Sequence, residues 1–242
     1  MAMKPLFALL AMAALSACAA GAPGPAPRPA PSPAAYDSSG QMTEAEASAA
    51  ARRFVNVVRT VEPVAEGECR RLSPGLNCDF LIVVDDRPGQ PSNAFQTLDG
   101  SGRPVLAFTL PLIADVQNED EMAFIMSHEA AHHIRAHLNR QRTNATAGAQ
   151  VFGVLASIAG AGGAGVEMAT QIGASVGART YSKDYELEAD ALGARIARAA
   201  GYDAIRGALY FTRIPDPGDR FLGTHPPNAN RMDTVRRALA SG

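Results

Sequence analysis

The spacing of apolar residues predicts a helix at the start of the folded part of the chain. Thr43 and Glu46 have the separation of a capping box, in which each side chain hydrogen-bonds the backbone N–H of the other residue. Apolar residues then recur every three or four positions, which gives a helix one apolar face. The residues of this face are Ala50, Phe54, Val57, Val58 and Val61. We therefore expect a helix over residues 43–61.

Shorter apolar runs, bounded by turn residues, predict four strands after this helix. Residues 64–70 and 79–84 are expected to pair with each other. Residues 93–98 and 104–109 are expected to form a second pair, because Asp-Gly-Ser-Gly separates them at residues 99–102. These pairs predict a small antiparallel sheet.

Helices are expected over most of the remaining chain. Residues 110–117 predict a short helix, and Asn118 with the acidic residues after it begins a longer helix that runs to about Arg140. Residues 147–178 are rich in Ala and Gly, and we interpret them as two close-packed helices broken around residues 160–163. A mobile lid and a hairpin that leans on a membrane are the alternatives for this segment.

The N-terminal residues have the pattern of an export signal. Residues 1–17 contain an early lysine, a short apolar run and small residues before Cys18. Leu15-Ser16-Ala17-Cys18 resembles the bacterial lipobox, so Cys18 is a candidate for lipidation and the mature N-terminus. An ordinary signal peptide that contains a cysteine is the alternative. By resemblance to lipoprotein sorting in Gram-negative bacteria, Ala19 favours anchoring at the periplasmic side of the outer membrane.

Composition divides the rest of the chain into a tether and one domain. Residues 18–40 alternate proline with Ala and Gly, which predicts an extended spacer without a core. Residues 41–242 suit a single globular domain. The formal net charge of −2, without a basic block, gives no indication of a nucleic-acid partner. Cys69 and Cys78 are expected to form a disulfide in an exported chain, although a metal role is the alternative.

The motif His-Glu-Ala-Ala-His at residues 128–132 is the main chemical signal in the sequence. On a helix, His128 and His132 lie one turn apart on the same face, and Glu129 lies beside them. This arrangement offers two nitrogen ligands to zinc and a carboxylate to the water on the metal. His133 and His137 are also four residues apart, but on a different face of the same predicted helix, so we interpret them as packing or hydrogen-bonding residues.

A third metal ligand is expected among acidic residues further along the chain. Glu186 and Asp190 are four residues apart, hence on one face of a predicted helix. Glu186 can then bind the metal, and Asp190 can accept the N–H of a ligating histidine. The alternative is a solvated acidic patch made of Asp184, Glu186, Glu188 and Asp190.

Five short segments, in a fixed order, carry a family resemblance. They are Asn-Ala-Phe at 93–95, Asn-Glu-Asp-Glu-Met-Ala at 118–123, the histidine motif with His137, Glu-Leu-Glu-Ala-Asp at 186–190, and Thr-His-Pro-Pro at 224–227 with Arg231. With these segments the chain resembles the HtpX and CAAX prenyl endopeptidase family of zinc metallopeptidases. It is most similar to the periplasmic and outer-membrane lipoprotein branch, here expected without tetratricopeptide repeats.

The resemblance implies a fold and roles for individual residues. The expected fold is α+β, a mainly helical zincin-type (gluzincin) metallopeptidase domain with a small antiparallel β-sheet. The resemblance implies that one Zn²⁺ is bound by His128, His132 and Glu186, and that Glu129 is the catalytic base. It also implies a substrate-binding edge strand at Asn93, Ala94 and Phe95. His225 and Arg231 are candidates to stabilise the oxyanion, and His225 could instead cap the zinc.

The sequence therefore predicts a zinc endopeptidase that cuts unfolded or misassembled envelope proteins. Its partners would be polypeptide substrates and, through the N-terminal lipid, the outer membrane. A zinc-bound assembly factor that binds peptides without cutting them is the main alternative, and a purely structural lipoprotein is another. Retention of Glu129 favours the enzyme, because a scaffold needs no base.

Overall fold

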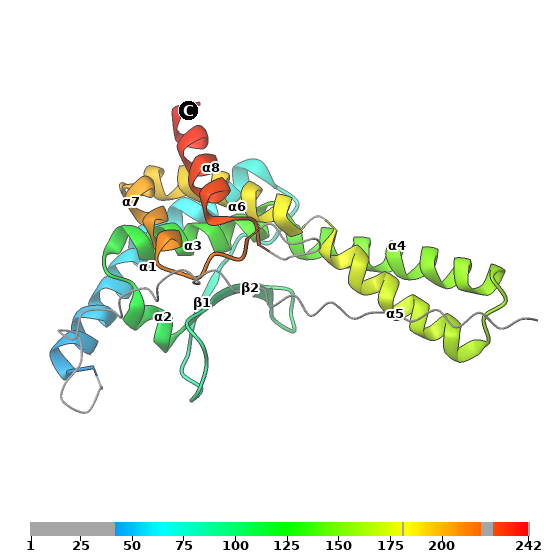
Figure 1. Cartoon of the computed structure of the whole chain (residues 1–242). Helices are drawn as coiled ribbons and strands as arrows, with labels where there is room; N and C mark the ends of the chain where they lie inside the picture. The colour runs from blue at the N-terminus through cyan, green and yellow to red at the C-terminus, as the bar shows by residue number, and fades with distance from the viewer. Residues whose placement is uncertain (1–41, 181, 219–224, 242) are drawn as a thin grey trace, which may run out of the picture.

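The computed structural model describes residues 42–180, 182–218 and 225–241. The predicted signal peptide, the lipidation site Cys18 and the tether over residues 18–40 lie outside these residues. The described part is mainly helical with one small sheet, which confirms the expected α+β class (Figure 1). No helix in the described part is long and apolar enough to cross a membrane.

Helix α1 (Glu44–Leu72) is longer than the sequence pattern predicted. It begins with the expected capping box between Thr43 and Glu46, but it continues through Pro63. The strand predicted over residues 64–70 is therefore wrong. The buried stripe of α1 extends past the proline to Ala65 and Cys69, so packing against the core offsets the cost of a proline inside a helix.

A disulfide joins the end of α1 to the segment that leads into the sheet. It links Cys69 to Cys78, whose Cα atoms are 5.7 Å apart. Both cysteines are buried in the main hydrophobic core. The disulfide therefore has a structural role, because it ties the long helix to the segment before the first strand.

The sheet contains three strands in the order β1-β3-β2, which are Leu81–Asp85, Pro104–Thr109 and Ala94–Leu98. Strands β2 and β3 pair antiparallel, as predicted for this hairpin. Strand β1 pairs parallel to β3, so the sheet is mixed and the expectation of a wholly antiparallel sheet is wrong. The reason is that the partner predicted for β1 is part of α1. Strand β2 is left at the edge of the sheet, beside the helices.

Helix α3 (Glu119–Ile134) carries the histidine motif through the centre of the domain. Nearly every residue of this helix is buried, and it contacts α1, α6, α7 (Ala204–Ala208) and β2. It follows the short helix α2 (Leu110–Asp115), which confirms that prediction. The predicted end of α3 near Arg140 is wrong, because Ala136 takes a left-handed conformation with φ of 53° and breaks the helix.

Two helices after this break project from the domain as a hairpin (Figure 1). They are α4 (His137–Ile158) and α5 (Gly163–Arg179), which confirms the prediction of two packed helices broken around residues 160–163. Glycines allow their backbones to approach closely. A Cβ atom on Gly148 would lie 2.1 Å from the carbonyl oxygen of Gly173.

The last helices close the domain around α3. Helix α6 (Ser182–Ala199) packs along α3, and α8 (Asn228–Ala240) packs on α6. A short 3-10 turn, Leu209–Thr212, connects α7 to the segment before α8. Helix α6 comes closest to α3 at Gly193, where a Cβ atom would lie 2.9 Å from the backbone N and Cα of His128.

This close approach predicts opposite effects for two glycine-to-alanine changes. Gly193→Ala forces α6 away from the backbone of α3, and we expect the free energy of unfolding to fall by about 1–2 kcal/mol. Gly67→Ala is the matched control, because Gly67 lies in α1 with no atom near its Cβ position. The control should be stabilised by about 0.5–1 kcal/mol. Urea unfolding of both variants measures the difference, and equal stabilisation would contradict the proposed contact.

Candidate metal centre

Three side chains from α3 and α6 converge in the lining of a cavity. The Nε2 atoms of His128 and His132 lie 3.0 Å apart. The Glu186 carboxylate lies 3.6 Å from His128 Nε2 and 3.3 Å from His132 Nε2. All three potential ligand atoms lie within 4.8 Å of one another. The structure thus brings together the three residues that the sequence predicted as ligands.

The spacing of these atoms fits a tetrahedral zinc ion. Zinc binds imidazole nitrogen and carboxylate oxygen at about 2.0–2.2 Å, so two ligands at the tetrahedral angle are about 3.3–3.6 Å apart. The distances of 3.3 and 3.6 Å fall in this range, and the distance of 3.0 Å between the two histidine nitrogens is slightly shorter. Two histidines and one carboxylate also form a common protein ligand set for catalytic zinc, which leaves one position open.

Charge around the site also favours a cation. Burial disfavours the charged form of His128, but its hydrogen bonds to Asp190 and Glu186 outweigh this effect and raise its pKa. Burial disfavours the charged form of Glu186 too, yet its contacts with His128, His132 and His225 hold its pKa well below the usual range. The Asp190 and Glu186 carboxylates therefore stabilise a positive charge on the His128 ring, and a bound metal ion would supply that charge in place of the extra proton.

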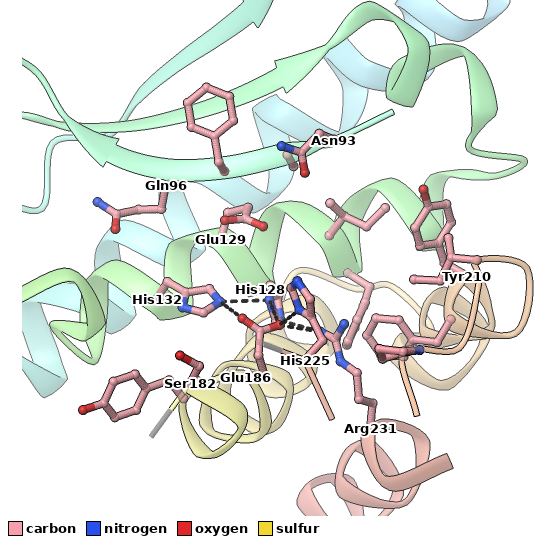
Figure 2. Close-up of a pocket in the computed structure, with 18 of the residues that line it drawn as sticks. Asn93, Gln96, His128, Glu129, His132, Ser182, Glu186, Tyr210, His225 and Arg231 are labelled. Carbon is pink, nitrogen blue, oxygen red and sulfur yellow. Dashed lines mark hydrogen bonds and ion pairs between the residues drawn. The ribbon is translucent and has the colours of Figure 1, made fainter. Parts of the chain in front are cut away.

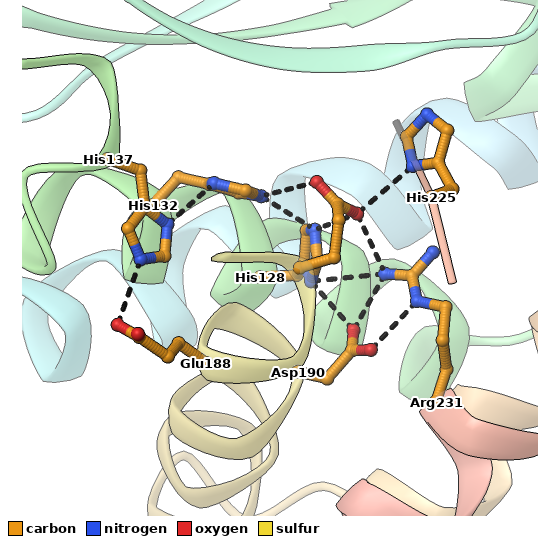
Figure 3. Close-up of polar contacts among 8 residues, drawn as sticks. His128, His132, His137, Glu188, Asp190, His225 and Arg231 are labelled. Carbon is orange, nitrogen blue, oxygen red and sulfur yellow. Dashed lines mark hydrogen bonds and ion pairs between the residues drawn. The ribbon is translucent and has the colours of Figure 1, made fainter. Parts of the chain in front are cut away.

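A buried ion pair between Asp190 and Arg231 orients the His128 ring (Figure 3). Asp190 Oδ1 lies 2.9 Å from His128 Nδ1, and Asp190 is completely buried. Arg231 donates two hydrogen bonds to the Asp190 carboxylate, at 2.8 and 2.7 Å, and its Nη2 lies 3.4 Å from Glu186 Oε2. Acceptance of the Nδ1 proton by Asp190 leaves His128 Nε2 with its lone pair directed at the metal position.

A second chain of contacts holds His132, and the sequence pattern did not reveal it (Figure 3). The Nδ1 atoms of His137 and His132 lie 2.9 Å apart, and His137 Nε2 lies 3.2 Å from Glu188 Oε2. Arg140 pairs with the same Glu188 oxygen at 2.7 Å. Burial, together with the neighbouring His132, lowers the pKa of His137 to about 4, so its ring is neutral.

These contacts fix the proton positions on both rings. Neutral His137 accepts the Nδ1 proton of His132 and donates its own Nε2 proton to Glu188, which leaves His132 Nε2 free to bind a metal. The expected hydrogen-bonding role of His137 is confirmed, but its expected place on a different face from the motif is wrong, because that expectation assumed a continuous helix. The turn at Ala136 redirects His137. His133 has the expected structural role, since its Nε2 lies 2.7 Å from the Asn77 carbonyl oxygen.

Glu129 of the motif and His225 from the segment before α8 both line the cavity. Glu129 is almost completely buried and lies on the side of α3 that faces β2 (Figure 2). No hydrogen bond ties its carboxylate to another residue of the described part. His225 Nδ1 lies 3.2 Å from Glu186 Oε2, and its side chain is 55% exposed. Glu129 and His225 are therefore the groups that a molecule in the cavity would meet.

The cavity has a volume of about 600 Å³ and runs along the edge strand β2. Figure 2 shows Asn93 and Gln96 across from the histidine motif, and the lining includes the predicted edge residues Asn93, Ala94 and Phe95. The backbone of Asn93 is hydrogen-bonded toward β3, where its carbonyl accepts from Thr109 N at 3.0 Å. Because pairing alternates along an antiparallel strand, Ala94 and Gln96 direct their N–H and C=O groups outward.

Comparisons with known proteins agree with this geometry and with the family resemblance of the sequence. The pattern of Peptidase family M48 matches residues 51–239. A protein named "Putative beta-barrel assembly-enhancing protease", from Vibrio cholerae serotype O1 (strain ATCC 39315 / El Tor Inaba N16961), is 34% identical over 143 residues. That alignment covers 56% of this chain and 28% of the relative, so the chain spans less than a third of that protein's length. The chain belongs to peptidase family M48, a family of metallopeptidases.

Proposed function

We propose that this protein is a zinc-dependent endopeptidase that binds one Zn²⁺ and cuts extended segments of unfolded or misassembled envelope proteins. The observation that carries the proposal is the convergence of His128, His132 and Glu186 beside Glu129, at a cavity that runs along an edge strand. A ligand set alone would serve a structural site. The added carboxylate and the open cavity are what a hydrolytic site needs.

The proposed chemistry divides between the metal and Glu129. When bound, zinc lowers the pKa of a water ligand to about 7 and polarises the scissile carbonyl. Glu129 accepts the proton that the water loses as its oxygen attacks the carbonyl carbon. Glu129 then returns this proton to the amide nitrogen as the C–N bond breaks.

We propose that substrate lies along β2 as an added strand. The outward N–H and C=O groups of Ala94 and Gln96 can pair with an extended peptide, since no other strand of the described part covers this edge. Main-chain pairing gives affinity without strict dependence on side chains. This property suits an enzyme that removes exposed segments of many different unfolded proteins.

The two basic candidates have different surroundings, which supports different roles. Arg231 is buried, and its Nε and Nη2 atoms contact Asp190 and Glu186, so we propose that it positions these two carboxylates. This role replaces the oxyanion role considered from the sequence. His225 is exposed at the cavity, and we propose that it donates a hydrogen bond to the tetrahedral oxyanion. Capping of the zinc by His225 is the alternative.

The proposed location is the periplasmic side of the outer membrane, through a lipid on Cys18. The lipobox-like residues before Cys18 and the proline-rich tether support this location. The name of the Vibrio cholerae relative, which refers to β-barrel assembly, supports envelope proteins as substrates.

Replacement of Glu129 tests catalysis separately from peptide binding. Glu129→Gln keeps the size of the side chain but removes the base, so we expect casein cleavage to fall by about 10²–10⁴-fold. Zinc content should stay at one ion per chain, and peptide affinity should stay unchanged. Glu44→Gln, an exposed position on α1, is the matched control and should cut normally. Full activity of Glu129→Gln would refute the mechanism. If neither the wild type nor the variant cuts while both bind peptides, the assembly-factor alternative holds.

The contact between His137 and His132 predicts an effect on metal affinity. His137→Phe keeps an aromatic ring against Tyr185 but removes the acceptor for the His132 Nδ1 proton. We expect zinc affinity, measured by competition with a chelator, to fall by about 10–100-fold. His137→Gln supplies an amide oxygen that can accept the same proton, so part of the affinity should return. An affinity that is equal in all three proteins would exclude a role for His137.

The alternating pairing of β2 predicts different effects for two proline substitutions. Ala94→Pro removes an outward N–H at the first residue of an edge strand, where proline is tolerated. We expect kcat/KM for an extended peptide to fall by about 2–10-fold, with Tm nearly unchanged. Thr97→Pro is the control, because the N–H of Thr97 faces β3 and its loss should lower Tm. Unchanged kcat/KM in Ala94→Pro would argue against strand addition at this edge.

A further inference from the structure

Exposed apolar side chains gather on the outer half of the α4–α5 hairpin, residues 150–172, which we name the hairpin tip. Seven of the thirteen large hydrophobic residues that are exposed in the described part lie there. Ile158 is the most exposed of these, at 79%. The other six are Val151, Phe152, Val154, Leu155, Met168 and Ile172. The tip also projects away from the helices of the domain (Figure 1), so none of them covers it.

Four of these side chains form one continuous stripe along α4. Val151, Val154, Leu155 and Ile158 have the spacing i, i+3, i+4 and i+7, which places them on one helical face. A neighbouring face of α4, which includes Phe152 and Gly153, contacts Gly173 and Thr170 of α5. The glycine contacts bring the two backbones together and leave little room for large side chains between the helices. The stripe therefore faces outward, without a partner in the described part of the chain.

Charge changes abruptly along the hairpin. Residues 147–178 contain one charged residue, Glu167. Arg142 and Arg179 are both exposed at the base of the hairpin. They lie at the same level, because Gly177 contacts Asn144 between them. Each arginine is 16 residues from the end of its helix at the tip, which corresponds to about 24 Å.

We propose that the hairpin tip docks onto the surface of a lipid bilayer. An apolar helical stripe enters the boundary between headgroups and acyl chains to a depth of about 5–10 Å, and cations near it attract anionic headgroups. Half of a bilayer, with its headgroups, is about 20–22 Å thick. Arg142 and Arg179, about 24 Å from the end of the tip, thus stay in or outside the headgroup layer at any depth within one leaflet.

The charge pattern favours lipid over a second copy of the chain. Arg140 of α4 pairs with Glu188, so the other charged residues of α4 and α5 are Arg142, Arg179 and Glu167, a net charge of +1, whereas the whole chain has a net charge of −2. This local excess of cations complements an anionic bilayer and would repel an identical hairpin. Glu167 precedes Met168 by one residue, about 100° around the helix, so it can remain among the headgroups.

The predicted lipid anchor would keep such a surface within reach. The 23 residues from Cys18 to Gly40 can extend to about 70 Å at roughly 3 Å each. The anchor would hold the protein near the membrane, and the hairpin tip would set its orientation. The docking proposal rests on the hairpin surface and does not depend on peptidase activity.

A single tryptophan tests the contact directly, because the chain has none. Ile158→Trp places this fluorophore in the hairpin tip, and Ile205→Trp, on α7 of the domain, is the control. Both are made in the full chain with Cys18→Ser, which cannot be acylated. Vesicles of phosphatidylethanolamine and phosphatidylglycerol should shift the Ile158→Trp emission to shorter wavelength, and brominated acyl chains should quench it. The Ile205→Trp emission should not respond.

A pair of charge variants gives a second readout, by flotation with the same vesicles. Leu155→Glu with Ile158→Glu should lower the partition coefficient by about 100-fold, since two large apolar side chains no longer enter the lipid. Ile205→Glu with Leu209→Glu, both exposed on the domain, should float like the parent.

Two outcomes would overturn the proposal. One is an Ile158→Trp emission that does not change with vesicles. The other is a shift that follows protein concentration without lipid, together with a doubled mass in light scattering, which would assign the stripe to a second copy of the chain.

Discussion

The contact between α3 and α6 is the constraint on which the candidate site depends. The candidate ligands come from segments more than fifty residues apart, and only close packing of the two helices brings their ligand atoms within 4.8 Å of one another. Gly193 permits this packing, because any larger residue would meet the backbone of His128 itself. The same contact sets Asp190 against His128 Nδ1. One helix crossing thus fixes both the position of Glu186 and the orientation of a histidine.

Buried polar groups surround the crossing, and they are costly to fold. Asp190 and Arg231 have almost no exposure, and each must lose its hydration shell. Their mutual hydrogen bonds, with His128 and Glu186 beside them, compensate for that loss only when all the groups are in place. A cluster of this kind contributes little net stability, but it restricts the side chains to one arrangement. This restriction is what a metal site of fixed geometry requires.

The break at Ala136 links the site to the periphery of the molecule. Its left-handed conformation ends the helix that carries the histidine motif and turns His137 back toward His132. The next residues then leave the domain as α4, whose far end carries the exposed apolar stripe. The direction of the hairpin and the support of His132 therefore have one structural origin. Contact of the hairpin with a membrane would orient the cavity and its edge strand relative to the lipid surface.

The sequence by itself indicated the peptidase family, the candidate metal ligands and most of the helices and strands. The spacing of His128, Glu129, His132, Glu186 and Asp190 follows the helical period, so neighbours on each helix could be paired without coordinates. The β2–β3 hairpin and the two glycine-rich helices were predictable for the same reason, since local turns and periodicity set them. The tertiary structure decided what periodicity does not encode. Because the apolar face of α1 packs against the core on both sides of Pro63, the helix continues through this residue. The predicted partner of β1 is therefore helical, and the sheet is mixed. A single left-handed residue redirected His137, because backbone breaks without glycine or proline leave no pattern in a sequence.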